Sequence, residues 1–137
     1  MIKNSSNKRG DILEFHHIGI ACKDIEQEIK KIKKIHDVKS ISKIVYDENQ
    51  KATLCMLSVE NGLNIELISG EQTSTILKRG ITYYHICYQV NDIKSKVDDL
   101  VSSGALLISY PKPAVLFNGK KVAFLQGSYG LIELVES

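Results

Sequence analysis

Residues 17–25 read HIGIACKDI and residues 85–93 read HICYQVNDI, so one pattern of apolar and polar positions occurs twice at an offset of 68 residues. Each copy starts as an apolar strand and continues into a helical pattern, in which aliphatic side chains recur every three or four residues. Asp24 with Gln27 predicts a capped start for the first helix, and Gly104 predicts the end of the second. The repeat indicates that the chain consists of two related halves.

Both halves continue from the helix into three short runs that are rich in β-branched and aliphatic residues. The runs are 38–46, 52–59 and 63–68 in the first half, and 105–110, 122–126 and 131–135 in the second. The dipeptides Asn61-Gly62 and Asn118-Gly119 predict tight turns before two of these strands. Each half is therefore expected to form a βαβββ module.

The two modules are expected to pair into one α+β domain, because a unit of roughly 55 to 60 residues buries too little surface to be stable alone. We assign repeat one to residues 14–70, a polar linker to residues 71–81 and repeat two to residues 82–137. Residues 1–13 are expected to form a flexible N-terminal tail outside this domain.

The composition is that of an ordinary globular protein, with 43% hydrophobic and 25% charged residues. A formal net charge of +2 disfavours a dedicated nucleic-acid binder. No apolar run approaches the about 18 residues of a membrane span, and the first residues lack the apolar core of a secretory signal, so we expect a cytoplasmic protein. Cys22, Cys55 and Cys87 lack the spacing of a zinc site or a disulfide framework and are predicted to be buried free thiols.

Two histidines and two glutamates occupy matching positions in the two repeats. His17 and His85 begin the first strand of each repeat, and Glu66 and Glu133 interrupt the apolar last strand of each. Any one of them could be a hydrogen-bonded core histidine or an exposed edge charge. A buried carboxylate needs a cation, and nitrogen and oxygen donors suit nickel, cobalt, zinc, manganese or iron(II). The matched set predicts a site for one divalent metal ion, with two positions left for water or substrate.

Other polar residues are assigned structural roles. Strand alternation predicts that His16 points to the face opposite His17, as a surface or core imidazole. His36 is expected to place a favourable charge near the C-terminus of the first helix. The lysines between residues 30 and 34 are expected to form a solvated helix face.

Four segments together resemble the vicinal oxygen chelate superfamily, in its glyoxalase I and methylmalonyl-CoA epimerase branch. They are HHIGIACKDI from His16, NIELISG from Asn64, YYHICYQVNDI from Tyr83 and KVAFLQGSYGLIELVE from Lys121. The resemblance implies a glyoxalase-like fold, in which two βαβββ modules form one curved mixed sheet around a metal site. It also implies that His17, Glu66, His85 and Glu133 bind one nickel, cobalt or zinc ion.

The resemblance further implies a reaction. In glyoxalases the substrate chelates the metal through two adjacent oxygens, and a carboxylate moves a proton through an enediolate. That catalytic base corresponds to Glu133 here, with Glu66 as its counterpart in the first repeat. We therefore expect a glyoxalase I-type lyase that acts on the hemithioacetal of a 2-oxoaldehyde, with glutathione or another thiol as co-substrate. We also expect a homodimer that binds a small molecule and neither nucleic acid nor membrane.

The chain departs from each named branch at specific positions. Ala21 stands where glutathione-dependent glyoxalases carry a basic residue, and residues 68–70 lack their asparagine. Residues 52–57 contain no carboxylate, although epimerases carry an acid on this strand. An acyl-CoA epimerase and a non-catalytic small-molecule-binding protein of the same fold are the alternatives, with an extradiol dioxygenase behind the two enzymes. Whether the site forms within one chain or across a dimer is open at this point.

Overall fold

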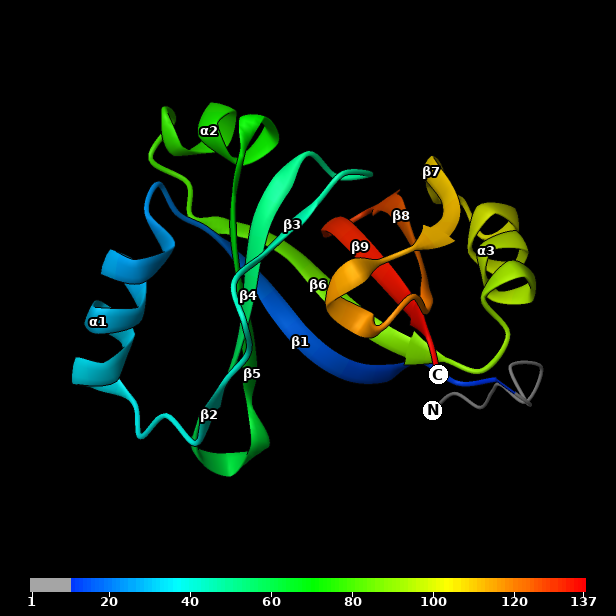
Figure 1. Ribbon diagram of the computed structural model, residues 1–137. Helices are drawn as coiled ribbons and strands as arrows, with labels where there is room; N and C mark the ends of the chain where they lie inside the picture. Colours follow the sequence, from blue (N-terminus) through cyan, green and yellow to red (C-terminus); the bar gives the residue numbers. More distant parts are fainter. Residues whose placement is uncertain (1–10) are drawn as a thin grey trace, which may run out of the picture.

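Nine strands form one curved mixed sheet with three α-helices in the computed structural model, which describes residues 11–137 (Figure 1). In chain order the elements are β1 (Glu14–Ala21), α1 (Ile25–Ile35), β2 (Ser40–Ile41), β3 (Val45–Asp47), β4 (Ala52–Ser58), β5 (Asn64–Gly70), α2 (Glu71–Leu77), β6 (Tyr83–Val90), α3 (Ile93–Ser102), β7 (Leu106–Pro113), β8 (Lys121–Gly127) and β9 (Gly130–Glu136). This architecture confirms the predicted α+β fold class.

The strand order shows how the two repeats combine. It runs β2-β4-β5-β1-β6-β9-β8-β7, and β3 pairs with β4 beside this path. Strand β1 lies parallel to β5 in the first repeat, and β6 lies parallel to β9 in the second. The repeats meet in the middle of the sheet, where β1 and β6 pair antiparallel. The two predicted modules therefore share one continuous sheet.

The turn and capping residues have the expected local geometry. The Asp24 side chain accepts a hydrogen bond from the Gln27 N–H at 3.1 Å, which caps α1. Asn61 and Gly62 both have left-handed φ angles, 63° and 75°, in the turn between the antiparallel strands β4 and β5. The predicted strand 38–46 is interrupted, because Ser42 lies between β2 and β3 and accepts the Met56 N–H through its side-chain oxygen.

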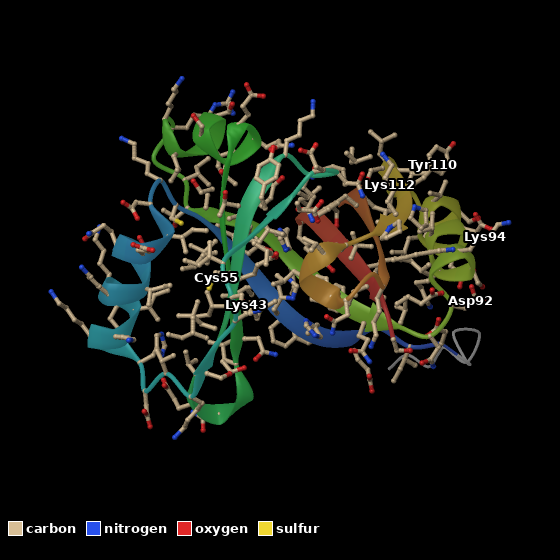
Figure 2. The ribbon with its side chains drawn as sticks, in the orientation of Figure 1. Lys43, Cys55, Asp92, Lys94, Tyr110 and Lys112 are labelled. Carbon is tan, nitrogen blue, oxygen red and sulfur yellow. The ribbon has the colours of Figure 1, made fainter. Side chains whose placement is uncertain are left out.

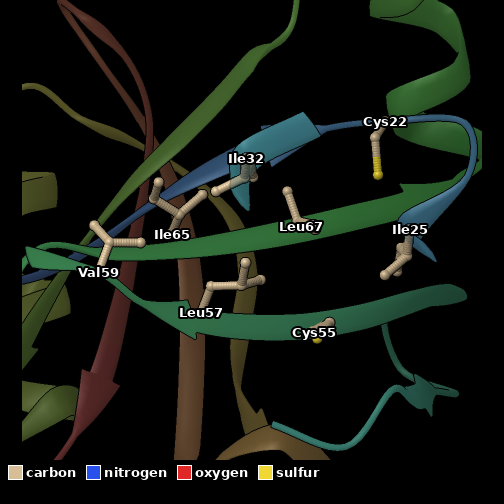
Figure 3. Packing of buried hydrophobic residues seen from close by; sticks show 8 residues of the cluster. All are labelled: Cys22, Ile25, Ile32, Cys55, Leu57, Val59, Ile65 and Leu67. Carbon is tan, nitrogen blue, oxygen red and sulfur yellow. The ribbon is translucent and has the colours of Figure 1, made fainter. Parts of the chain in front are cut away.

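Apolar side chains attach α1 and α3 to one face of the sheet. Ile25 and Ile32 of α1 pack with Leu57 and Leu67 in a buried cluster (Figure 3). The second repeat builds a corresponding cluster around α3. Each fully buried aliphatic side chain of this kind contributes about 1.5 to 3 kcal/mol. Because side chains alternate along a strand, the polar residues between these apolar positions face the other side of the sheet.

The connection between the repeats is more ordered than a polar linker. Residues 71–77 of the predicted linker 71–81 form α2, and the Thr73 side chain accepts the Gly70 N–H at 2.9 Å at the start of this helix. In the predicted tail 1–13, residues 1–10 lie outside the described residues. The Asp11 carboxylate accepts hydrogen bonds from Asn91 N–H and Asp92 N–H, both at 2.8 Å, so Asp11 is held near the start of α3.

All three cysteines are buried and free, as the sequence predicts. Among residues 11–137, the helices are too short and too polar for any of them to span a bilayer.

Candidate metal centre

The four residues that the repeat singles out converge at the middle of the sheet. His17 lies on β1, Glu66 on β5, His85 on β6 and Glu133 on β9, and these four strands are neighbours in the order β5-β1-β6-β9. All four side chains are at most 1% exposed. The four side chains converge within one chain.

The distances between the donor atoms match those around a metal ion. His17 Nε2 lies 2.9 Å from Glu66 Oε1, 3.2 Å from Glu133 Oε1 and 3.2 Å from His85 Nε2. His85 Nε2 lies 3.2 Å from Glu66 Oε1 and 3.0 Å from Glu133 Oε1. Bonds of about 2.1 Å place adjacent donors about 3.0 Å apart around an octahedral ion and about 3.4 Å apart around a tetrahedral one. The four donor atoms are therefore close enough together to bind one ion.

Unpaired polar atoms also point to a cation at this place. Glu66 Oε2, both carboxylate oxygens of Glu133 and His85 Nδ1 are buried and have no hydrogen-bond partner among the described residues. Two buried carboxylates without full compensation would be costly, and a divalent cation between them offsets that cost. The two nitrogens and two oxygens fit such an ion by their chemistry and by their positions.

Each charge in the cluster stabilises the opposite charge beside it. Burial by itself lowers the pKa of His85, but the charge of Glu133 raises it to about 9. Burial by itself raises the pKa of Glu133, but the charge of His85 holds it at about 2. A metal ion must displace protons from such imidazoles, so the affinity for the ion should rise with pH.

Gly19 provides the space for the imidazole of His85. The two residues are partners across β1 and β6. A Cβ atom at position 19 would lie 2.3 Å from His85 Cε1, 2.5 Å from its Nδ1 and 2.7 Å from its Nε2. No side chain can occupy this position unless His85 moves.

Two β-bulges precede the two histidines of the cluster, and they correct the expectation for His16. Phe15 pairs with Tyr88 and His17 with Cys87, so His16 is an extra residue in β1. The bulge brings His16 to the same side as His17, with 2.7 Å between the two Nδ1 atoms. Alternation along a regular strand had predicted opposite faces, and that prediction is wrong because the strand is irregular here. Burial and the neighbouring His17 lower the pKa of His16.

The second bulge is the counterpart of the first. Gly19 pairs with His85 and Ile20 with Tyr83, which leaves Tyr84 as the extra residue in β6. The rings of Tyr84 and His85 lie edge to face, with their centroids 5.2 Å apart. Residues 16 and 84 are thus equivalent in the two repeats, although one is a histidine and the other a tyrosine.

Cys87 also lies close to the cluster and could combine with His16 and His17. Its side chain is fully buried, and burial together with the charges of Glu133 and Glu66 raises the pKa of its thiol. Metal binding through sulfur requires the thiolate. The set of two histidines and two glutamates is therefore the better candidate for a divalent ion.

Residues of both repeats line a cavity of about 180 Å³, and two of them, Tyr84 and Phe124, lie against the His85 ring. Tyr84, Phe124 and Leu131 contribute to its lining, and the Phe124 and His85 rings lie 5.6 Å apart between centroids. Its polar lining includes Tyr110 and Lys112 of β7, which Figure 2 labels, and Asn49, Gln50 and Gln72 of the first repeat and the connection. The described lining contains no aspartate, glutamate, histidine or cysteine. Sequence analysis did not identify this cavity.

The other polar residues occupy structural positions. His36 ends α1 as its C-terminal cap, and its Nδ1 lies 2.7 Å from Glu60 Oε2. The four lysines at positions 30, 31, 33 and 34 are exposed on α1, as expected for a solvated helix face.

Comparison with known proteins agrees with this fold. Residues 16–124 match the Glyoxalase/Bleomycin resistance protein/Dioxygenase superfamily. The chain belongs to this superfamily. Its members include epimerases and dioxygenases, typically bind a divalent metal and small-molecule substrates, and often act as dimers. No curated protein sequence matches the chain.

Solved structures of the superfamily share the fold at low sequence identity. Methylmalonyl-CoA epimerase from Mycobacterium tuberculosis is 21% identical, with a TM-score of 0.71 over 90% of this chain and 87% of that one. A single-residue variant of the Streptomyces coelicolor methylmalonyl-CoA epimerase, in complex with 2-nitronate-propionyl-CoA, is 22% identical, with a TM-score of 0.69 over 92% and 96%. A hypothetical protein from Bacillus halodurans C-125 is 23% identical, with a TM-score of 0.67 over 94% and 96%. At these identities the likeness establishes the glyoxalase-like fold.

Proposed function

We propose that this protein is a metal-dependent lyase of the glyoxalase I type, which moves a proton between adjacent carbons in the hemithioacetal of a 2-oxoaldehyde. One observation carries the proposal: two histidines and two glutamates converge in one buried cluster, and the nearby cavity has no carboxylate, imidazole or thiol among its described lining residues. We infer that the cluster supplies both the cation site and a carboxylate as the catalytic base.

His17, Glu66, His85 and Glu133 would hold one divalent cation, with nickel, cobalt and zinc as the candidates. Such a cation supplies Lewis acidity, which stabilises negative charge on substrate oxygens. A cation that takes six ligands would keep two positions open beside these four donors, which would suit a substrate with two adjacent oxygens. The arrangement therefore favours a substrate with neighbouring hydroxyl and carbonyl groups.

Glu133 is the proposed base. It would take the proton from one carbon and return it to the neighbouring carbon, as a carboxylate general base does. Glu133 Oε1 lies 3.0 Å from His85 Nε2 and Glu66 Oε1 lies 2.9 Å from His17 Nε2, so the two carboxylates have similar surroundings, and Glu133 is chosen because it matches the glyoxalase base. Phe124, which lines the cavity, is the cross-strand partner of Glu133 on β8 and β9. Glu66 is then mainly a ligand.

The test is turnover of methylglyoxal hemithioacetals, prepared with glutathione and with other thiols, on protein loaded with nickel, cobalt or zinc. We expect thioester formation that depends on the metal, and the thiol that supports it identifies the co-substrate. A protein that binds metal but turns over none of these substrates contradicts the glyoxalase assignment.

An acyl-CoA epimerase is the second candidate. Two observations favour it: the structural similarity to methylmalonyl-CoA epimerases, and the presence of one buried carboxylate from each repeat at the cluster. The absence of an acidic residue from β4 (Ala52–Ser58) weighs against it. Deuterium exchange from solvent into the α-carbon of methylmalonyl-CoA separates the two, since only an epimerase catalyses it. Ligand binding without either reaction supports a non-catalytic binding protein.

A further inference from the structure

The bulge at His16 is held in place by side chains of the first repeat. The Asn64 side chain donates a hydrogen bond from Nδ2 to the His16 carbonyl at 2.9 Å. The Ser58 hydroxyl in turn donates to Asn64 Oδ1 at 2.6 Å. The His16 carbonyl, which the bulge removes from the strand pairing, therefore has a hydrogen-bond partner, and this contact stabilises the bulged backbone at His16.

His16 contacts the one nitrogen of His17 that the cluster does not use. His17 Nε2 faces Glu66 and His85, whereas its Nδ1 lies 2.7 Å from His16 Nδ1. An imidazole that offers the Nε2 lone pair to a metal carries its hydrogen on Nδ1. This hydrogen can be donated to the lone pair on His16 Nδ1.

Phe117 stacks its ring against one face of the His17 imidazole. Its ring is nearly parallel to that of His17, with 19° between the planes and 5.9 Å between the centroids. It meets the ring of His16 at 75°. The orientation of His17 is thus constrained by a hydrogen bond at its edge and by an aromatic ring on one face.

The second repeat lacks this arrangement. Tyr84 occupies the position equivalent to His16, and His85 Nδ1 has no hydrogen-bond partner among the described residues. The two histidines of the cluster therefore differ: His17 Nδ1 has a hydrogen-bond partner among the described residues, and His85 Nδ1 has none.

We propose that His16 is a positioning residue for the metal centre. It accepts the Nδ1–H of His17, fixes the tautomer that presents Nε2 to the ion and sets the direction of the ring. The inference rests on the metal site of the proposed function, but it does not depend on which reaction that site catalyses. Loss of such a supporting partner typically weakens metal affinity by about 10- to 100-fold.

The test compares His16→Phe with His16→Asn by equilibrium competition of cobalt(II) between the protein and a chelator. Phenylalanine keeps a ring beside Phe117 but has no acceptor, so we expect cobalt affinity to fall by about 10- to 100-fold. Asparagine places an amide oxygen near the site of Nδ1, so we expect affinity within about threefold of wild type. His36→Asn is the matched control, since His36 pairs with Glu60 away from the cluster and its loss should leave cobalt affinity unchanged.

A second measurement reports which ring nitrogen of His17 carries the hydrogen. In the zinc-loaded, nitrogen-15-labelled protein, we expect NMR to show the Nδ1–H tautomer of His17 in the wild type and in His16→Asn. The proposal is overturned if His16→Phe binds cobalt as tightly as the wild type, or if His16→Asn is as weak as His16→Phe. A wild-type protein that binds no divalent metal overturns the metal site and this proposal together. A protein that binds cobalt as predicted but has no turnover overturns the proposed reaction alone.

Discussion

Gly19→Ala should eliminate tight metal binding by displacing one ligand with a single methyl group. The new Cβ would lie 2.3 Å from His85 Cε1, and carbon atoms pack at about 3.5 Å, so the ring must move by about 1 Å. Metal–ligand distances tolerate deviations of only about 0.2 Å. His85 would then no longer bind the ion together with the other three residues. We expect a loss of affinity greater than the about 100-fold that removal of a supporting partner causes.

The assay is cobalt(II) competition against a chelator, with thermal unfolding as a check that the variant is folded. Overpacking a core position costs about 1 to 3 kcal/mol, so the variant should melt earlier but still fold. Cys87→Ala is the matched control, because Cys87 faces His17 as Gly19 faces His85, and its Cβ is already accommodated there. It should bind cobalt like the wild type. If a folded Gly19→Ala protein binds cobalt as tightly as the wild type, a methyl group at position 19 does not displace His85, and the prediction is wrong.

Three further predictions follow from the same geometry. Glu133→Gln should lower kcat by about 10² to 10⁴ in the hemithioacetal assay while much of the metal affinity remains, and Glu66→Gln should be milder; the reverse order assigns the base to Glu66. In chelator-treated protein, the free energy of unfolding should decrease as the pH rises from 6.5 to 9, because folding raises the pKa of His85 to about 9. It should also decrease as the pH falls from 4.5 to 2, because folding lowers the pKa of Glu133 to about 2. Denaturant titrations that give the same free energy of unfolding at every pH contradict this prediction. Cobalt at 100 times its Kd should stabilise the fold by about 2.7 kcal/mol, and calorimetry that shows no increase in Tm excludes binding to the native state.

Much of the architecture follows from patterns that are local in the sequence. Apolar alternation, the Asn61-Gly62 turn and the Asp24 cap are short-range features, and they predict the strands and helices of both repeats. The cluster was predictable for a different reason. A histidine at residues 17 and 85 and a glutamate at residues 66 and 133 occupy matching positions in a repeat, and the strand order then makes their four strands neighbours.

What sequence analysis missed depends on the pairing between strands. The bulge at His16 exists only in the register of β1 against β6, and alternation within β1 alone predicts the wrong face. A signal was nevertheless present, because His16-His17 and Tyr84-His85 are both pairs of ring-bearing residues at the repeat offset. Phe117 has no such signal: it reaches His17 from a short 3-10 helix at Val115–Phe117, which only the tertiary fold places there.

Metal stoichiometry tests the central claim most directly. The claim is that His17, Glu66, His85 and Glu133 of a single chain hold one divalent ion. The measurement is metal content by mass spectrometry after reconstitution with cobalt, nickel or zinc and removal of excess ion, on the wild type and on His85→Ala. The account predicts one ion per wild-type chain and very little in the variant. Equal metal content in the two proteins, or a folded wild type that retains none of the three metals, contradicts it.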